Sequence, residues 1–181
     1  MTDSTAPLFQ YYVAASVDGF IADRDGSIDW LLAFGMDEFT AGYETFIAGV
    51  GAVVMGSSTY EFLLGEGPDA WSYDMPAWVL TTRELETIPG RDIRFLSGDV
   101  ATHRDDIVGS AAGKNVWIVG GGDVAAQFSR AGLLDELQLT VMPLVLGAGA
   151  PLLAVDSLRS LELTGSTPFP SGAIELRYRV R

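Results

Sequence analysis

The chain has 181 residues, a formal net charge of −13 and no cysteine, with 48% hydrophobic and 19% charged residues. This length and composition predict one globular domain, residues 1–181, rather than a disordered segment. The lack of cysteine excludes disulfides and thiolate sites, and a single histidine leaves too few ligands for a transition-metal centre, so no metal is expected. The acidic balance excludes nucleic-acid and anionic-membrane binding, because both need clustered lysine and arginine.

No apolar segment is long enough to cross a bilayer, and the first residues lack the cationic and apolar parts of a signal peptide. The expected compartment is therefore the cytoplasm.

Apolar runs and helical patterns alternate along the first two thirds of the chain. Strands are expected at 8–16, 52–55, 78–81, 93–96, 116–119, 136–143, 161–164 and 174–180. A loop is expected at 17–36, and helices at 37–48, 57–64, 100–112 and 123–131. The strand–helix–strand units predict a mostly parallel central sheet, and the strand-only tail predicts an antiparallel C-terminal edge. The expected fold class is a three-layer α/β/α domain.

The strongest local motif runs from Val119 to Ala125, where a buried strand ends in three glycines that open into a helix. Glycine lets a ligand approach the backbone, and free amides at a helix start attract phosphate. The motif also fits the dinucleotide fingerprint Gly-x-Gly-x-x-Ala. The cofactor-binding residues predicted here are Val119, Gly120, Gly121, Gly122, Asp123, Val124 and Ala125.

Two more strand ends carry groups that suit an anionic ligand. One is the turn with Gly56, Ser57 and Thr59, where serine capping of the helix is an alternative explanation. The other is Thr81-Thr82-Arg83, where the arginine is alternatively a surface charge. Because the carboxyl ends of parallel strands lie at one edge of the sheet, the three junctions together predict a groove for an extended phosphorylated cofactor.

The order of these motifs resembles the dihydrofolate reductase superfamily. The resemblance rests on 14–22, Trp30, Val54-Met55-Gly56-x-x-Thr59, Leu80-Thr81-Thr82 and 118–122. The segment 131–147 is especially similar to the reductase domain of the bifunctional riboflavin-biosynthesis deaminase–reductase. The resemblance covers the chain from about Leu8 to Val180.

This resemblance implies roles for individual residues. Ala14 and Ile21 would line the nicotinamide, and Gly120 and Gly121 would be joined by a cis peptide beside it. Gly56 and Thr59 would contact phosphate, and Thr81 and Thr82 would lie near the ribose phosphate of the adenosine. Trp30 and Thr140 would lie around the substrate.

The cofactor expected from the resemblance is NADPH. The family's arginine after the Gly56 equivalent is Ser57 here, and its basic residue after the glycines is Asp123. Arg83 could replace them, because a guanidinium can bind phosphate through two hydrogen bonds.

The substrate site is expected around aromatic residues. Trp30 with Phe34, Phe39 or Tyr43 could sandwich a flat heterocycle. Asp37 and Glu38 are the candidate proton donors, although a solvated helix start is an alternative role for both. The threonine–glycine and arginine motif of the riboflavin-pathway enzymes is absent after Trp30.

The sequence therefore predicts an NADPH-dependent reductase. It would transfer hydride to a C=N-type bond of a pterin-like or aminopyrimidine substrate, such as 5-amino-6-(5-phosphoribosylamino)uracil. The alternatives are a non-catalytic nucleotide-binding homodimer and a Rossmann-type dehydrogenase. The resemblance also suggests that the protein is a homodimer, with contacts around 144–153.

Overall fold

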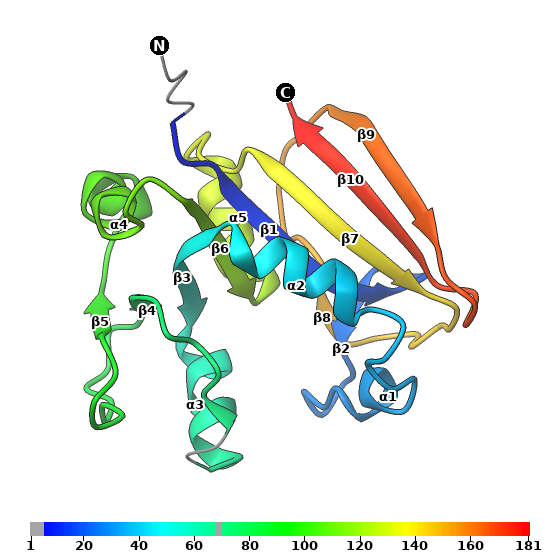
Figure 1. Ribbon diagram of the computed structural model, residues 1–181, viewed down its shortest axis with the longest axis horizontal. Coiled ribbons are helices and arrows are strands. Elements are labelled where there is room, and N and C mark those ends of the chain that lie inside the picture. The colour runs from blue at the N-terminus through cyan, green and yellow to red at the C-terminus, as the bar shows by residue number, and fades with distance from the viewer. Residues whose placement is uncertain (1–5, 68–69) are drawn as a thin grey trace.

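The computed structural model describes residues 6–67 and 70–181. Its main sheet has the strand order β5-β4-β3-β6-β1-β7-β10-β9 (Figure 1). The bounds of these strands are β1 Phe9–Ser16, β3 Val50–Gly56, β4 Ala77–Leu80, β5 Ile93–Leu96, β6 Asn115–Gly120, β7 Glu136–Met142, β9 Leu161–Pro168 and β10 Ile174–Val180. A second, two-stranded sheet pairs β2 (Phe20–Ala22) with β8 (Ala150–Pro151).

The main sheet is parallel from β5 to β7 and antiparallel from β7 through β10 to β9. Its parallel core is built from short runs of β-branched residues that are buried on both faces, such as Val53, Val54 and Ile118. The predicted mixed α/β fold with an antiparallel C-terminal edge is therefore confirmed.

Helices cover both faces of the sheet. On one face, α2 (Thr40–Ala48) and α3 (Ser57–Gly65) pack through residues such as Phe46 and Tyr60. On the other face, α4 (Arg104–Ser110) and α5 (Gly122–Arg130) pack through Ile107 and Phe128. Phe128 also stacks against Phe9 of β1, with 5.1 Å between the ring centroids. These contacts produce the three layers.

Three elements differ from the sequence-based expectation. The loop at 17–36 contains β2 and the short helix α1 (Asp29–Leu32). The helix expected to begin at residue 37 begins at Thr40, because the preceding residues form a turn in which the Phe39 amide donates to the Met36 carbonyl. The helix expected over 100–112 is divided into the 3₁₀-helix η2 (Val100–His103) and α4. The Asp99 carboxylate caps η2 by accepting from the Ala101 amide.

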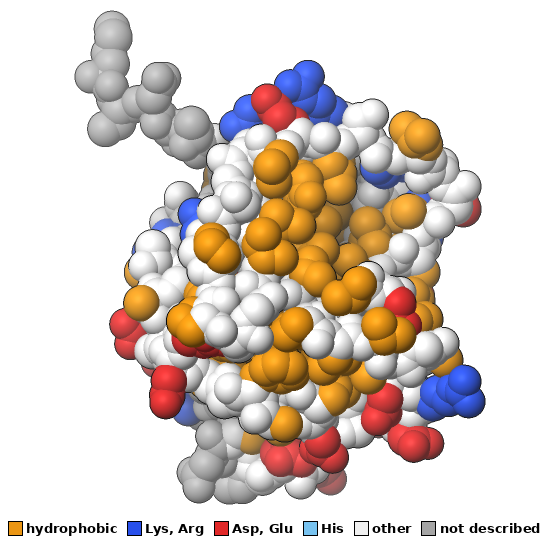
Figure 2. All heavy atoms as spheres, turned by 90° about the vertical axis from the view of Figure 1, so that its right-hand side faces the viewer, with side chains coloured by type: hydrophobic (Ala, Val, Ile, Leu, Met, Phe, Trp, Pro, Cys, Tyr) orange, Lys and Arg blue, Asp and Glu red, His pale blue; other side chains and the backbone are white. Residues whose placement is uncertain are grey.

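The last two strands extend beyond the helices. Leu161 and Leu163 of β9 lie opposite Val180 and Tyr178 of β10, on the face that packs toward α5. These two leucines are 44% and 56% exposed, and Ile174 is 37% exposed. Hydrophobic side chains gather over this side of the molecule (Figure 2). In the described residues, no helix is long and apolar enough to cross a bilayer.

Candidate functional site

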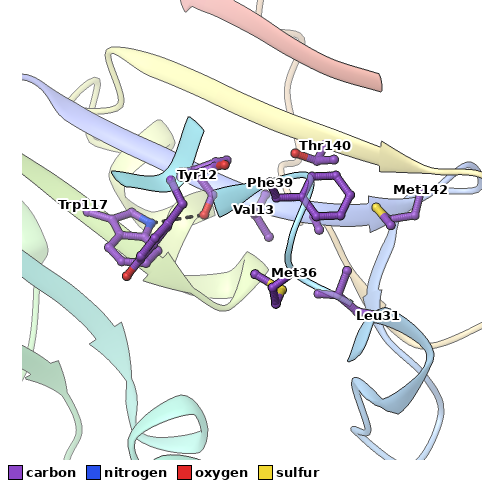
Figure 3. A pocket seen from close by; sticks show the side chains of 10 residues that line it. Tyr12, Val13, Leu31, Met36, Phe39, Trp117, Thr140 and Met142 are labelled. Carbon is purple, nitrogen blue, oxygen red and sulfur yellow. Dashed lines mark hydrogen bonds between the residues drawn. The ribbon is translucent and has the colours of Figure 1, made fainter. Parts of the chain in front are cut away.

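A cavity of about 210 Å³ lies between the sheet and the segment that leads into α2 (Figure 3). We call it the aromatic cavity. It is lined by Tyr12, Val13, Ala14, Leu31, Met36, Phe39, Tyr43, Trp117, Thr140 and Met142. None of these residues carries a formal charge, so the cavity suits a flat, largely uncharged ring.

Strand register fixes the wall of this cavity. Ala14 of β1 lies opposite Thr140 of β7, and Tyr12 lies two residues earlier on the same face of β1. The Trp117 indole donates to the backbone carbonyl of Tyr12 at 3.1 Å, as the dashed line in Figure 3 shows. The Tyr12 ring also packs edge-on against Phe46 of α2, with centroids 4.6 Å apart. The position of the tyrosine is therefore set from two sides.

A second cavity of about 340 Å³ lies where β3, β4 and β6 end. We call it the glycine groove. Its lining residues are Ile21, Gly56, Ser57, Ser58, Thr59, Leu80, Gly121, Gly122, Asp123, Val124, Gln127, Ala150 and Pro151. Both α3 and α5 begin here, so two helix starts direct backbone amides toward the same space. Because β6 lies between β3 and β1, the groove and the aromatic cavity occupy neighbouring positions along the sheet.

Two glycines at the end of β6 are in places where a side chain would be crowded or would clash. The peptide bond between Gly120 and Gly121 is cis, as the resemblance implied. A Cβ on Gly122 would lie 2.0 Å from the Pro151 carbonyl oxygen, and one on Gly120 would lie 3.3 Å from the Thr59 hydroxyl. Because these positions carry no side chain, the groove presents bare backbone at the end of β6.

Hydrogen bonds between two loops hold together the side of the groove that contains β2. The Asp18 carboxylate accepts from the amides of Leu146 and Gly147, at 3.0 and 2.7 Å. The Ser16 hydroxyl and these amides hold the pKa of Asp18 below its usual value. The Leu152 amide donates to the Gly19 carbonyl at 2.9 Å. These bonds hold Ile21 of β2 and Pro151 of β8 over the glycines.

The third predicted junction lies next to the groove rather than in its lining. The Thr81 hydroxyl accepts from the Arg83 amide at 2.9 Å, and Thr82 is exposed. The Arg83 guanidinium binds both carboxylate oxygens of Glu61 on α3, at 2.9 and 2.6 Å. Arg83 thus already has an anionic partner, in an ion pair that is open to solvent.

The structure brings most of the predicted cofactor residues together. Ile21, Gly56, Ser57, Thr59, Gly121, Gly122, Asp123 and Val124 line the glycine groove, and Ala14 lines the aromatic cavity. Gly120 is buried directly behind the groove. Val119 and Ala125 pack in the two layers of core and line neither cavity.

The predicted substrate and proton-donor residues are divided. Tyr43 and Thr140 line the aromatic cavity, as does Phe39, whereas Trp30 and Phe34 pack in a satellite core cluster.

Asp37 and Glu38 line neither cavity. Asp37 is exposed. One oxygen of the Glu38 carboxylate accepts from the Ser171 amide at 3.2 Å, and its Oε1 is buried without a hydrogen-bond partner in the described residues.

Sequence reasoning missed several lining residues. Tyr12, Met36, Trp117 and Met142 line the aromatic cavity, and Gln127 lines the groove. The alternating pattern of β1 could have placed Tyr12 on the same face as Ala14. No local signal marks Met36, which reaches the cavity through the path of the loop. Among residues 6–67 and 70–181, no three acidic or histidine side chains cluster as they would around a metal ion.

Comparisons with known proteins agree with this geometry. The family model described as "RibD C-terminal domain" matches residues 7–174. The chain is 33% identical over 172 residues to the uncharacterized protein YwjB of Bacillus subtilis, covering 92% of this chain and 94% of that one.

Two solved structures are also similar to this chain. A Shewanella sp. PV-4 protein named for riboflavin biosynthesis is 27% identical, with a TM-score of 0.81, over 96% of this chain and 99% of that one. Dihydrofolate reductase from Enterococcus faecalis, solved with NADP(H), is 16% identical, with a TM-score of 0.62, over 96% of each chain. At that identity, this second match shows the fold alone.

The contact between Gly122 and Pro151 can be tested by substitution. We expect Gly122→Ala to destabilise the protein by about 2–3 kcal/mol, because the new methyl group would push β8 away from α5. Gly109→Ala is the matched control. Gly109 lies in α4, where a Cβ would meet nothing within 4 Å, and alanine there should stabilise by about 0.5–1 kcal/mol. Urea unfolding followed by tryptophan fluorescence measures both, and equal midpoints would contradict the close approach.

Proposed function

The chain belongs to the RibD C-terminal domain family, and on that premise we propose that it is a nicotinamide-dependent reductase of a nitrogen heterocycle. It would transfer hydride to a C=N-type bond of a pterin-like or aminopyrimidine substrate. The proposal rests on two cavities that lie next to each other along neighbouring strands. One is lined by backbone and hydroxyl groups at helix starts, and the other by aromatic and aliphatic side chains.

The glycine groove fits the diphosphate of a dinucleotide. Two helix starts supply amides there, and Ser57 and Thr59 add hydroxyl donors. A Cβ on Gly121 would have only Ile21 Cδ1 nearby, at 3.9 Å, so the missing side chain there leaves room for a ligand close to the backbone. A nicotinamide cofactor, when bound, supplies the hydride, and the chain's own groups supply position and a dry pocket.

We propose NADPH as the cofactor, with Arg83 as the group that distinguishes it from NADH. Among the described residues, Asp123 is the single charged one in the groove lining, and its carboxylate does not favour an additional phosphate. Arg83 and Glu61 are 55% and 41% exposed, so their ion pair contributes little stability and can exchange. A ribose phosphate held near Thr81 and Thr82 would take the place of Glu61 on the guanidinium.

The aromatic cavity supports a ring as the reacting part of the substrate. A charged phosphoribosyl group would find no cation among the described lining residues and would have to extend toward solvent. Pterin-like and aminopyrimidine rings are both flat and largely uncharged, so both fit this cavity.

One observation favours a second function, that of a non-catalytic nucleotide-binding protein. No acidic side chain lines the aromatic cavity in the described residues, so a proton donor must act from behind its wall. Turnover with a candidate substrate distinguishes the two functions. The family match argues against a Rossmann-type dehydrogenase, because it places the chain in another lineage.

Cofactor binding gives the first test. We expect NADPH to quench the fluorescence of Trp117, which lies beside the site, and to bind more tightly than NADH. Arg83→Ala should weaken NADPH binding about tenfold and leave NADH binding unchanged, because only NADPH carries the additional phosphate. Arg91→Ala, which breaks a surface pair with Asp74, is the control. No binding of either nucleotide would refute the proposed function, and equal effects on both would refute the role of Arg83.

The proton donor gives the second test. We propose Glu38 rather than Asp37, because Glu38 directly precedes the cavity-lining Phe39 in the sequence and its Oε1 is buried without a hydrogen-bond partner among the described residues. Glu38→Gln should lower NADPH-dependent turnover about 100-fold and flatten its pH profile. Asp37→Asn, with its exposed side chain, is the control. The assays use dihydrofolate and 5-amino-6-(5-phosphoribosylamino)uracil as substrates. Unchanged turnover in the double variant, Asp37→Asn with Glu38→Gln, would refute both residues as proton donors.

We further propose that the protein is a cytoplasmic homodimer. Within the expected contact region at 144–153, Val145 is exposed, whereas Leu152 and Leu153 pack on the core. A larger uncovered apolar surface lies on β9 and β10, formed by Leu161, Leu163 and Ile174. A second copy burying this surface would remove it from water.

For the compartment, the cysteine-free composition suits a reducing environment.

Light scattering should then give twice the chain mass of 19.3 kDa. Leu163→Glu should raise the dimer dissociation constant at least about 100-fold, because each copy would bury an unpaired carboxylate. Leu158→Glu changes a more exposed leucine outside β9 and should leave the mass unchanged. A wild-type monomer, or an L163E dimer of wild-type strength, would contradict this interface.

A further inference from the structure

One wall of the aromatic cavity belongs to a segment with little support of its own. Met36 and Phe39 line the cavity (Figure 3), and both lie in the stretch 33–39 between α1 and α2. Within the described part of the chain, all but one of the hydrogen bonds of this stretch join residues at most four positions apart. A segment held by local bonds alone opens more readily than a strand of the sheet does.

The exception is a bond to the other end of the sequence. The Ser171 amide donates to Oε2 of Glu38 at 3.2 Å. Ser171 lies in residues 169–173, which connect β9 to β10 (Figure 1) and which we call the hairpin turn. Beside this bond, the Phe169 ring packs edge-on against the ring of Phe39, with centroids 4.7 Å apart. One turn therefore holds two adjacent residues of the wall segment.

The hairpin turn is closed by its own hydrogen bonds. The Phe169 amide donates to the Ala173 carbonyl at 2.8 Å, and the Gly172 amide donates to the Phe169 carbonyl at 3.0 Å. Gly172 has a φ of +89°, which glycine adopts without a steric penalty. Ala173 is 1% exposed, in the same buried cluster as Phe39 and Met142. The turn thus offers Glu38 and Phe39 a support that is itself anchored in the core.

Phe169 and Ser171 do not line the aromatic cavity themselves. They act on it through Phe39, whose ring is 8% exposed and forms part of the lining. Interiors are close-packed, so a ring keeps its place only while its neighbours fill the space around it. Without Phe169, the Phe39 ring could turn away from the cavity into the space left behind.

We propose that the hairpin turn supports the wall of the aromatic cavity, with Phe169 and Ser171 as positioning residues. Phe169 fixes the Phe39 ring against the bound heterocycle, and the Ser171 amide fixes the Glu38 carboxylate. The inference rests on the proposed function for the ring and for the role of Glu38. It adds that the affinity for the ring is set partly by residues outside the cavity.

Amide hydrogen exchange followed by NMR tests the bond to Glu38. Glu38→Ala should speed the exchange of the Ser171 amide about tenfold, because this amide then has water as its partner. The Gly172 amide is an internal reference, since its bond to the Phe169 carbonyl does not involve Glu38. Asp37→Ala changes the exposed neighbouring acid and should leave both amides unchanged. Equal exchange of the Ser171 amide in E38A and the wild type would overturn its positioning role.

Titration calorimetry with pterin and with NADPH tests the role of Phe169. Phe169→Ala should weaken pterin binding about tenfold and leave NADPH binding unchanged, because the glycine groove does not include the wall segment. The amides of 33–39 should exchange faster in this variant, and those of β1 should not. Phe95→Ala is the matched control, since this ring on β5 is also partly exposed and packs edge-on against Tyr60. Its pterin affinity should equal that of the wild type.

Three results would overturn the role of Phe169: no pterin binding by the wild type, unchanged pterin affinity in folded F169A, or equal weakening of pterin and NADPH. If circular dichroism shows that F169A does not fold, Phe169→Leu takes its place. Cofactor binding separates this inference from the proposed function. A wild type that binds pterin in the expected way but does not bind NADPH refutes only the reductase. A wild type that binds NADPH, with pterin affinity independent of Phe169, refutes only the role of the hairpin turn.

Discussion

The side-chain-free backbone at the end of β6 is the constraint on which the rest of the site depends. Gly120 and Gly122 allow Thr59 of α3 and Pro151 of β8 to approach one corner of the sheet. Any Cβ on Gly122 would separate α5 from β8, and β8 holds β2 in place through their shared ladder. Since β6 is a central strand with β3 and β1 on either side, this corner organises both cavities at once.

The two cavities differ in chemistry because they lie on different parts of the sheet. The glycine groove is at the strand ends, where backbone amides of α3 and α5 are free to bind, whereas the aromatic cavity is under α2, where side chains decide the lining. Amides in direct contact can attract an anion despite the net charge of −13. At physiological ionic strength the Debye length is about 8 Å, so distant carboxylates contribute little against them.

Residue types alone predicted the parts of the protein that depend on local sequence. The β-branched runs around Val53 and Ile118 and the glycine corner are such parts, and the structure contains all three. The β2–β8 pairing and the position of Glu175 opposite Thr140 depend on the register between distant strands, which no local pattern encodes. The resemblance and the aromatic ring of Trp30 place it near the substrate, and it packs in a cluster with Phe39 and Met142, which line the aromatic cavity.

Two glutamate–arginine pairs show that the same residue types can serve different functions, depending on how deeply the glutamate is buried. Glu61 and Arg83 are both largely exposed, so water and salt compete with their bond and a phosphate can replace the carboxylate. The side chain of Glu175 is 3% exposed and pairs with the 55% exposed Arg177, so the carboxylate is withdrawn from water and an anion from solution does not readily take its place. The first pair therefore suits recognition of an exchangeable anion at the rim. The second is fixed within the fold, because removing the arginine would leave a buried charge without its partner.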